Sequence, residues 1–257
     1  MVAAAALALA PVASPARVPR VSHVVVVVLE NLERSDVVGS SQAPYLNTIR
    51  QRYADLTMYT AVSHPSLPNY LALVSGSTHG IADDCETCSV RGPSVGTLLG
   101  RRGLSWGGFA QGYPASPSFV KRHMPFLYFA GQSPHVHPLD ALSPRRLPAY
   151  AFVAPDLCND AHDCPLSTAD RFLSGFLPPF LRAPATVVFV VFDEGTSDAG
   201  GGGHVYAVAA GTAVRAHSVY RRPTNHYGLL RTIEDALGLP RLGRSASAQP
   251  ITGIWRR

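Results

Sequence analysis

Two uninterrupted runs of apolar residues constrain the fold more than any other feature of this sequence. One covers His23–Leu29 and contains five consecutive valines, and the other covers Thr186–Phe192 and reads TVVFVVF. Continuous rather than alternating apolar residues are typical of parallel strands that are buried on both faces. Longer mixed segments separate such runs, which predicts strands alternating with helical crossovers and therefore an α/β fold with a mostly parallel sheet. Shorter runs of the same kind cover Leu104–Ala110, Ala149–Ala154 and Val205–Ala210.

Helices are expected in the segments between the strands. Residues Tyr227–Leu237 give the clearest signal, because Gly238 and Pro240 follow them and both are typical of a helix end. The Pro-rich segment 112–148 predicts irregular structure instead. Two further helices are expected over Ala43–Tyr53 and Pro68–Val74.

The composition is that of a folded protein rather than a disordered chain. Of 257 residues, 46% are apolar and 15% are charged, and the formal charge is +5. Such a chain can bury a full core, and we expect one domain over residues 21–257. Lys121 is the only lysine, and the arginines are scattered rather than gathered in a run. We therefore expect no nucleic-acid partner and only a weak preference for anionic ligands.

The N-terminal segment and the cysteines indicate an oxidising compartment. Residues 1–20 begin MVAAAALALAPVASPAR, a small-residue apolar stretch similar to the end of a truncated secretory signal segment. Two close cysteine pairs, Cys85 with Cys88 and Cys158 with Cys164, favour disulfides in an exported chain. A zinc site built from the same cysteines is the alternative. No later run of 18 apolar residues is present, so we expect a secreted, extracellular protein without a transmembrane anchor.

Acids and an amide follow the predicted strands. Glu30 and Asn31 come directly after the first valine-rich run, Asp193 and Glu194 come after the second, and Asp156 follows a third. In open parallel sheets, ligands bind outside the carboxyl ends of the strands. Adjacent buried carboxylates raise each other's pKa unless a cation lies between them, and carboxylate and amide oxygens suit a hard divalent ion. The pattern therefore predicts a divalent metal site at this edge.

The segment 63–76, which reads SHPSLPNYLALVSG, predicts a nucleophile at the start of a helix. Pro68 suits a first helical turn, and Ser66 lies just outside it, at the positive end of the helix dipole. Backbone N–H groups at such an end can hold a phosphate. Asn69 can reach back to donate to a phosphoryl oxygen. The alternative is that Ser66 only caps the helix.

Histidines supply the third group of candidates. In the segment 156–164, DLCNDAHDC, a Cys158–Cys164 disulfide would close a tight loop around Asn159, Asp160 and His162. A stapled loop can hold an imidazole still, as a general acid requires, although a surface histidine without function is the alternative. His226 precedes the last helix and can either cap it or face the strand ends. His204, after the Gly200–Gly203 run, has the same ambiguity.

Taken in order, the motifs resemble a known enzyme family. They are VVVVLEN, SHPSLPNYLALVSG, PDLCNDAHDC, VVFDEGTSD and NHYGLLRTIEDALGLPRLG, with ITGIW at the end, and they span about Val24 to Trp255. They look like the bacterial phosphoesterase family of acid phosphatases and phospholipases C, within the alkaline-phosphatase-like superfamily. The likeness is greatest to its small SapM-type secreted acid phosphatases, often described as phosphatidylinositol-3-phosphatases. This resemblance implies a three-layer sandwich with helices on both faces of the sheet.

The resemblance also implies roles for individual residues. It makes Ser66 the nucleophile, in contact with one divalent ion (Mg, Ca, Mn or Zn). It gives His162 a part in turnover, and it makes Asn69 the side chain that binds a phosphoryl oxygen. On chemical grounds we expect His162 to protonate the leaving alcohol. We also expect Asn69 and the backbone N–H after Ser66 to stabilise the negative charge that develops on the phosphoryl oxygens. The ion's other ligands would be Glu30, Asn31, Asp193 and Glu194, and the further substrate contacts would be His64, Asn159 and His226.

The function implied is hydrolysis of a phosphate monoester through a phosphoserine. The substrate would be a small phosphorylated molecule, with phosphoinositides among the candidates, and we expect a monomer. The alternative within the family is a phosphodiesterase of the phospholipase C kind. Outside it, a non-enzymatic surface protein would need a broken site. Two departures bear on the metal: Glu194 is Asp in other branches, and no Asp-x-x-x-His spacing starts at Asp156. We therefore expect one ion, and we expect His162 to perform part of the role that a second ion has in relatives with two metals.

Overall fold

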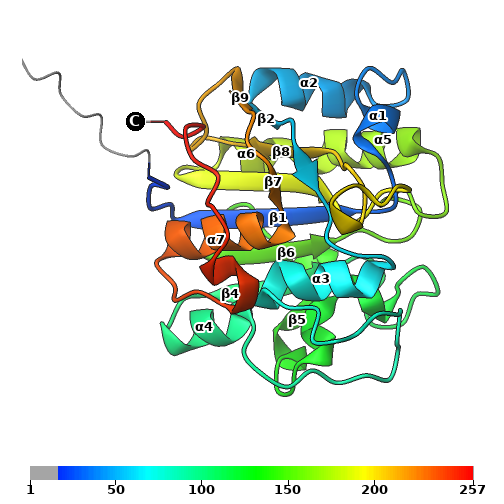
Figure 1. The fold of residues 1–257 in the computed structure, drawn as a ribbon, viewed down its shortest axis with the longest axis vertical. Helices are drawn as coiled ribbons and strands as arrows, with labels where there is room; N and C mark the ends of the chain where they lie inside the picture. Colours follow the sequence, from blue (N-terminus) through cyan, green and yellow to red (C-terminus); the bar gives the residue numbers. More distant parts are fainter. Residues whose placement is uncertain (1–16, 257) are drawn as a thin grey trace, which may run out of the picture.

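The computed structural model describes residues 17–256 and contains an eight-stranded sheet (Figure 1). The strand order is β5-β4-β6-β1-β7-β8-β2-β9, and every neighbouring pair is parallel except the two pairs that β8 makes. A second, two-stranded sheet pairs β10 with β3. The strands are β1 His23–Leu29, β2 Ala54–Leu56, β3 Tyr59–Thr60, β4 Trp106–Ala110, β5 Val136–Pro138, β6 Tyr150–Ala154, β7 Thr186–Phe192, β8 Ala207–Ala210, β9 Ser218–Tyr220 and β10 Thr224–Asn225.

The two valine-rich runs form the centre of the sheet, as predicted. β1 and β7 lie side by side and are in register from His23 opposite Thr186 to Leu29 opposite Phe192. Both are buried, apart from His23 at the start of β1, because helices cover both faces of the sheet. β8 is the exception to the parallel arrangement. No α-helix lies between β7 and β8 in the described chain, so β8 does not return by a helical crossover and pairs with β7 in the antiparallel direction.

Helices pack on both faces of the sheet, which confirms the expected three-layer sandwich. α3 and α7 contact each other on one face, and α2 packs with α5 on the other (Figure 1). The three predicted helices are all present, with bounds that differ by one or two residues. The helices are α1 Arg34–Val37, α2 Pro44–Arg52, α3 Ser66–Ser75, α4 Val95–Arg101, α5 Leu166–Phe176, α6 Pro178–Arg182 and α7 His226–Leu237.

The segment 112–148 has little regular structure, as its proline content predicted. It holds the short edge strand β5 and several 3-10 turns, and its residues cover the β4 edge of the sheet. These turns are η1 Lys121–His123, η2 Pro125–Tyr128, η3 Ser133–His135 and η4 Leu139–Ala141; two more, η5 Ala199–Gly201 and η6 Gly243–Ala246, lie later in the chain.

The cysteines form two disulfides, Cys85–Cys88 and Cys158–Cys164, and the zinc alternative is therefore wrong. Each pair closes a short local loop, and neither leaves a thiolate for a metal. Most of the expected signal segment, residues 1–16, lies outside the described residues. Within residues 17–256, no helix is long and apolar enough to cross a membrane.

Candidate active site

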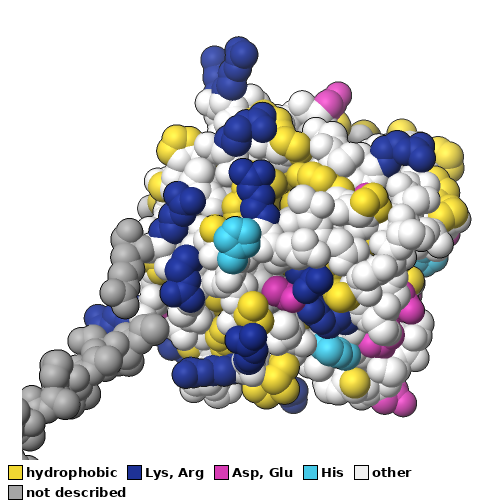
Figure 2. All heavy atoms as spheres, turned by 90° about the horizontal axis from the view of Figure 1, so that it is seen from above, with side chains coloured by type: hydrophobic (Ala, Val, Ile, Leu, Met, Phe, Trp, Pro, Cys, Tyr) yellow, Lys and Arg dark blue, Asp and Glu magenta, His cyan; other side chains and the backbone are white. Residues whose placement is uncertain are grey.

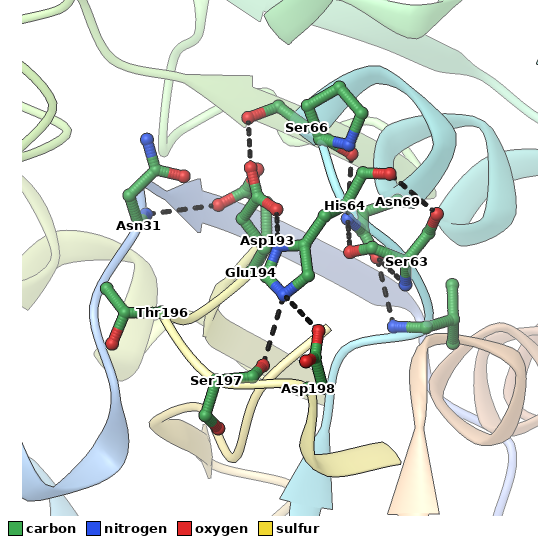
Figure 3. A network of polar contacts seen from close by, with 12 residues as sticks. Asn31, Ser63, His64, Ser66, Asn69, Asp193, Glu194, Thr196, Ser197 and Asp198 are labelled. Atoms are coloured by element: carbon green, nitrogen blue, oxygen red, sulfur yellow. Dashed lines mark hydrogen bonds and ion pairs between the residues drawn. The ribbon is translucent and has the colours of Figure 1, made fainter. Parts of the chain in front are cut away.

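The carboxyl ends of β1 and β7 meet the first turn of α3 at one edge of the sheet (Figure 3). Because Leu29 and Phe192 are directly paired, the next residues, Glu30 and Asp193, leave the sheet side by side. The backbone N–H of Asp193 donates to the carbonyl oxygen of Leu29 at 2.9 Å, which fixes this arrangement. The strand ends therefore place their acids within reach of Ser66.

The hydroxyl of Ser66 lies between two carboxylates. Its Oγ is 3.1 Å from Oε2 of Glu30 and 3.0 Å from Oε1 of Glu194. The helix begins at Ser66, and Pro65 occupies the capping position, so the alternative that Ser66 only caps the helix is wrong. Ser66 is only 3% exposed, and its hydroxyl stands at the positive end of the α3 dipole.

The acids around Ser66 are crowded and buried. Burial, together with the neighbouring Asp193 and Asp160, raises the pKa of Glu30 well above its ordinary value. Burial and the adjacent Glu194 raise the pKa of Asp193 to about 8, and burial also raises the pKa of Glu194. Uncompensated negative charge in a buried site is costly, and a bound cation can compensate it.

Asn31 and Asp193 each direct an unpaired oxygen into the site. The backbone N–H of Asn31 donates to Oδ1 of Asp193 at 3.2 Å, and Asn31 adopts a left-handed φ of 53° that allows this contact. Oδ1 of Asn31 and Oδ2 of Asp193 are buried and have no hydrogen-bond partner among the described residues. Buried oxygens without partners are rare in folded proteins, and a bound ion can satisfy them. These two oxygen atoms are therefore suitable ligands for a divalent cation.

His64 lies beside Glu194 and holds it in place. Its Nδ1 pairs with Oε2 of Glu194, and its Nε2 is 3.0 Å from the carbonyl oxygen of Ser197. The carboxylate of Asp198 is 4.0 Å from the same Nε2 (Figure 3). The backbone and carboxylate contacts to Ser197, Glu194 and Asp198 outweigh burial and raise the pKa of His64. His64 is thus at the site, with its ring nitrogens directed at protein groups.

Asn69 has different partners from those predicted. Oδ1 accepts from the backbone N–H groups of Val62 and Ser63, at 3.0 and 3.2 Å. Nδ2 donates to the carbonyl oxygens of Ser63 and Pro65, at 2.8 and 3.2 Å. These four bonds use the full capacity of the amide. Asn69 therefore shapes the turn before Ser66, and its predicted donation to a phosphoryl oxygen does not fit this arrangement.

The backbone N–H after Ser66 is also engaged. Leu67 donates to Oδ1 of Asp84 at 2.9 Å, so the carboxylate of Asp84 occupies the position expected for a phosphoryl oxygen. Arg122 faces the other oxygen of Asp84 at 3.6 Å. An acidic side chain is favourable at a helix N-terminus for the same reason as a phosphate. Asp84 was not predicted, because its partner on α3 is distant in sequence.

The predicted role of His226 as a substrate contact is wrong. Its ring is completely buried, and its Nε2 is 2.6 Å from the carbonyl oxygen of Asp193. Its Nδ1 lies 3.0 Å from the hydroxyl of Tyr59. Both ring nitrogens are thus occupied by protein groups, and neither is left to bind a substrate.

The loop closed by Cys158–Cys164 approaches the site from the β6 side. Nδ1 of His162 is 2.6 Å from Oδ1 of Asp163, and the imidazole is 29% exposed. The amide of Asn159 donates to Gln111 at 3.1 Å. This loop therefore presents a partly exposed imidazole, as a general acid requires. The roles of His162 and Asn159 remain predictions.

His123 and Tyr70 are site residues that the sequence did not reveal. The hydroxyl of Tyr70 donates to Oε1 of Glu30, and Nε2 of His123 lies 3.3 Å from the same oxygen. Nδ1 of His123 faces Oδ2 of Asp160 at 3.2 Å. Burial lowers the pKa of His123 to about 3 and raises that of Asp160 to about 7. Glu30, His123 and Asp160 form a cluster whose ligand atoms all lie within 4.8 Å of one another.

Glu33 organises the Gly-rich loop 195–204. Its Oε1 accepts from the backbone N–H groups of Thr196 and Ser197 at 3.0 and 2.9 Å, and its Oε2 accepts from that of His204 at 3.0 Å. A Cβ atom at Gly203 would lie 2.7 Å from Oε1 of Glu33, which accounts for glycine there. The loop therefore folds around the carboxylate of Glu33, which contacts its two ends.

Comparisons with known proteins identify a family and several relatives of this chain. The Phosphoesterase family model matches residues 39–240. A phosphatidylinositol-3-phosphatase of Mycobacterium tuberculosis is 32% identical over 92% of this chain and 84% of its own length. A phosphate-repressible acid phosphatase of Penicillium chrysogenum is 27% identical over 83% of this chain, which spans only 59% of that protein.

Solved structures share the fold at low sequence identity. A protein of the alkaline phosphatase superfamily from Vibrio parahaemolyticus has a TM-score of 0.64 at 14% identity, over 91% of this chain and 71% of its own. The lipoteichoic acid synthase LtaP of Listeria monocytogenes has a TM-score of 0.63 at 13% identity, over 92% of this chain and 75% of its own. Together with the phosphatase relatives, the family match confirms the predicted enzyme class, a phosphoric monoester hydrolase: the chain belongs to the Phosphoesterase family.

Proposed function

We propose that this chain is a secreted, metal-dependent phosphatase that hydrolyses phosphate monoesters through a phosphoserine on Ser66. One observation carries the proposal: the buried Ser66 hydroxyl lies 3.0 and 3.1 Å from carboxylate oxygens of Glu194 and Glu30 at the start of a helix. A serine hydroxyl needs a nearby group to take its proton and a positive environment for its alkoxide, and this placement supports both.

The residues that would hold the cation offer oxygen ligands only. Glu30, Asn31, Asp193 and Glu194 would supply carboxylate and amide oxygens, with Oγ of Ser66 completing the set. Such a set suits Mg²⁺, Ca²⁺ or Mn²⁺, and Zn²⁺ also accepts carboxylate ligands. A bound divalent cation would lower the pKa of the Ser66 hydroxyl and balance the charge of the three acids.

In the proposed reaction, Oγ of Ser66 attacks phosphorus in line while the bond to the leaving alcohol breaks. The Ser66 proton passes to a neighbouring carboxylate, Glu194 or Glu30. His162 donates a proton to the leaving oxygen, and then accepts one from the water that attacks the phosphoserine. In that second step the bond between phosphorus and Oγ of Ser66 breaks, inorganic phosphate leaves, and the protonated carboxylate, Glu194 or Glu30, returns its proton to Oγ. Asp163, 2.6 Å from Nδ1 of His162, orients the imidazole.

The substrate is proposed to be a small phosphorylated molecule. The relative named as a phosphatidylinositol-3-phosphatase makes phosphoinositides the first class to test. Two disulfides in the described residues support an extracellular location, and we propose that the enzyme acts as a monomer. A phosphate-release screen across phosphoinositides, nucleotides and sugar phosphates would identify the preferred class.

The decisive experiment compares Ser66→Ala with Ser75→Ala. Ser75 lies at the other end of the same helix, where its hydroxyl bonds the carbonyl oxygen of Leu71 at 2.7 Å. We expect Ser66→Ala to fold normally, to lose p-nitrophenyl phosphate hydrolysis, and to give no phosphoserine after acid quenching. Ser75→Ala should keep both signals. Robust turnover by Ser66→Ala would exclude the covalent route.

Two further measurements test the metal and the ester class. Exhaustive chelation should abolish activity, and a defined divalent ion should restore it. Full activity in metal-free protein would remove the ligand assignments for Glu30, Asn31, Asp193 and Glu194.

The enzyme should also hydrolyse p-nitrophenyl phosphate faster than bis-p-nitrophenyl phosphate. The reverse order would instead identify a phosphodiesterase of the phospholipase C kind.

A further inference from the structure

Arginines that are scattered along the sequence come together at the β9 end of the sheet. β9 is the last strand in the sheet order, and Arg221 and Arg222 follow it directly. Arg215 lies just before it, and the backbone N–H of His217 donates to the carbonyl oxygen of Arg52 at 3.2 Å. This bond brings the end of α2 beside the start of β9. The fold therefore gathers basic side chains that no sequence run predicts.

The charge at this end is not neutralised by acids. Four exposed arginines have no ion-pair partner among residues 17–256: Arg52, Arg215, Arg221 and Arg222. Asp55, the carboxylate that β2 contributes here, is buried and already pairs with Arg34 and Arg50, each at 2.8 Å. Seen from this end, Lys and Arg side chains form a band down the left half of the view, and acids lie mainly to the right (Figure 2). Such a surface attracts anionic ligands.

The exposed large hydrophobic side chains of residues 17–256 also lie at this end. They are Met58, which is 45% exposed, and Val219, which is 39% exposed. Val219 is the middle residue of β9, and the residues on either side of it are buried. Met58 lies beside the segment that follows β9, because its carbonyl oxygen accepts from the backbone N–H of Thr224 at 3.1 Å. Exposed apolar side chains among basic ones are typical of an interaction surface.

This end of the sheet is connected to the active-site edge. β2 and β9 run in the same direction as β1 and β7, since β8 is antiparallel to both β2 and β7. Their carboxyl ends therefore lie on the edge of the sheet that holds the site. A cavity of about 470 Å³ is lined by Met58 and Pro223 and also by Ala199, the neighbour of Asp198, which faces His64 at 4.0 Å. A partner bound at this end is thus close to the site.

We propose that this end of the molecule binds the surface of an anionic lipid bilayer. The binding surface, called the β9 surface below, consists of Arg52, Met58, Arg215, Val219, Arg221 and Arg222. The planar guanidinium groups pair with lipid phosphates, and the two apolar side chains insert at the level of the headgroups. Stable attachment of a protein to a bilayer surface takes two contributions, and this surface supplies both charge and apolar area.

The charge favours a bilayer over a second copy of the chain. The outer edge of β9 pairs with no strand among the described residues, and an open edge can pair with the same edge of another molecule. That pairing would bring the arginines of two copies together, and their repulsion opposes it. The inference goes beyond the proposed function and does not rest on the chemistry at Ser66, because it concerns where the protein binds.

The test is co-sedimentation with vesicles of phosphatidylcholine, alone or with about one third phosphatidylglycerol. The wild type should bind the anionic vesicles only, and about 1 M salt should release it, because the Debye length falls to about 3 Å. Arg221→Ala/Arg222→Ala should bind roughly 25-fold more weakly, at about five-fold for each arginine. The matched control is Arg101→Ala/Arg102→Ala, an exposed arginine pair at the end of α4, which packs on β4 far from β9 in the strand order. It should bind like the wild type.

A second variant tests the apolar contribution. Met58→Gln/Val219→Thr changes no charge and keeps the side chains similar in size, so we expect roughly ten-fold weaker binding from the lost apolar area alone. All three double variants should hydrolyse the soluble substrate p-nitrophenyl phosphate at the wild-type rate. Ser66→Ala should bind vesicles like the wild type. Failure of the proposed chemistry and failure of the β9 surface therefore give different results.

Three results would overturn the proposal. The first is wild-type binding that is absent with anionic vesicles or is unchanged in Arg221→Ala/Arg222→Ala. The second is a loss in the arginine variant with none in Met58→Gln/Val219→Thr, which would identify a site for soluble polyanions instead. The third is a dimer in analytical ultracentrifugation that Met58→Gln/Val219→Thr dissociates, which would assign the β9 surface to a second copy of the chain.

Discussion

The Nε2 atom of His226 donates to the backbone carbonyl oxygen of Asp193 at 2.6 Å. The Tyr59 hydroxyl lies 3.0 Å from Nδ1 on the other side of the ring. A neutral imidazole with its hydrogen on Nε2 satisfies both contacts, because the hydroxyl then donates to Nδ1. Burial lowers the pKa of His226 to about 4, which keeps the ring neutral at ordinary pH. His226 therefore fixes the end of β7, where Asp193 begins the site.

This buried ring predicts a stability that depends on pH. The folded-state pKa of His226 is about 4, below the ordinary value of 6.5, so the unfolded chain binds the extra proton first as pH falls. The contribution of the neutral His226 ring to the free energy of unfolding is fully present above pH 6.5 and is lost as pH falls toward 4. The loss is roughly 3 kcal/mol, because each pKa unit corresponds to about 1.4 kcal/mol.

Urea unfolding of the wild type and of His226→Gln at a series of pH values checks this. The difference in unfolding free energy between them should be largest near pH 7 and should shrink toward pH 4. His217→Gln, which replaces an exposed histidine, should show no such trend. A difference for His226→Gln that stays constant with pH would contradict the neutral, buried ring.

The sequence was informative where residue order alone fixes proximity. Continuous valine runs are typical of central strands, and adjacent parallel strands end at the same edge, so Glu30 and Asp193 were expected to be neighbours. Ser66 followed from the helix signal. These predictions required only the positions of residues along the chain, not the orientations of their side chains. For the same reason, the sequence predicted which residues form the site better than it predicted their hydrogen-bond partners.

Roles that depend on orientation or on distant contacts were not predictable. Asn69 occupies the expected turn of α3, but its amide turns back to the loop before Ser66. His123 lies in an irregular segment whose sequence has no periodicity, and Glu30 is far from it along the chain. Glu33 contacts backbone groups more than 160 residues away. No local pattern encodes such contacts.

Replacing Asn69 should destabilise the protein as well as slow it. Asn69→Ala removes a buried amide and its four partly buried hydrogen bonds, and leaves backbone groups of Val62 and Ser63 without partners. We expect a loss of unfolding free energy on the order of 2–4 kcal/mol, since each unsatisfied buried group costs about 1–3 kcal/mol. Because Ser66 shifts, kcat should fall more than KM rises. Unchanged stability with a large rise in KM would instead indicate a direct substrate contact.

Removing Glu33 should loosen the loop 195–204 and displace His64. Glu33→Ala takes away the acceptor of three backbone N–H groups, and the Ser197 carbonyl that contacts His64 lies in that loop. We expect faster cleavage of the loop in limited proteolysis and roughly a ten-fold lower kcat, equivalent to about 1.4 kcal/mol. Asp140→Asn, at an exposed acid on the turn η4, is the control. A cleavage rate equal to that of the wild type would show that Glu33 does not anchor the loop.

The role of His162 as the acid for the leaving group predicts a dependence on the substrate alcohol. p-Nitrophenolate leaves easily without protonation, whereas an alkyl alkoxide needs a proton as the bond to phosphorus breaks. His162→Asn should therefore lower kcat/KM, which reports only the steps up to phosphoserine formation, modestly with p-nitrophenyl phosphate but by about 10²–10⁴-fold with an alkyl phosphate such as glycerol phosphate. His135→Asn, at an exposed histidine, serves as the control. Equal losses on both substrates would assign His162 to binding or to folding, because neither of those roles distinguishes a good leaving group from a poor one.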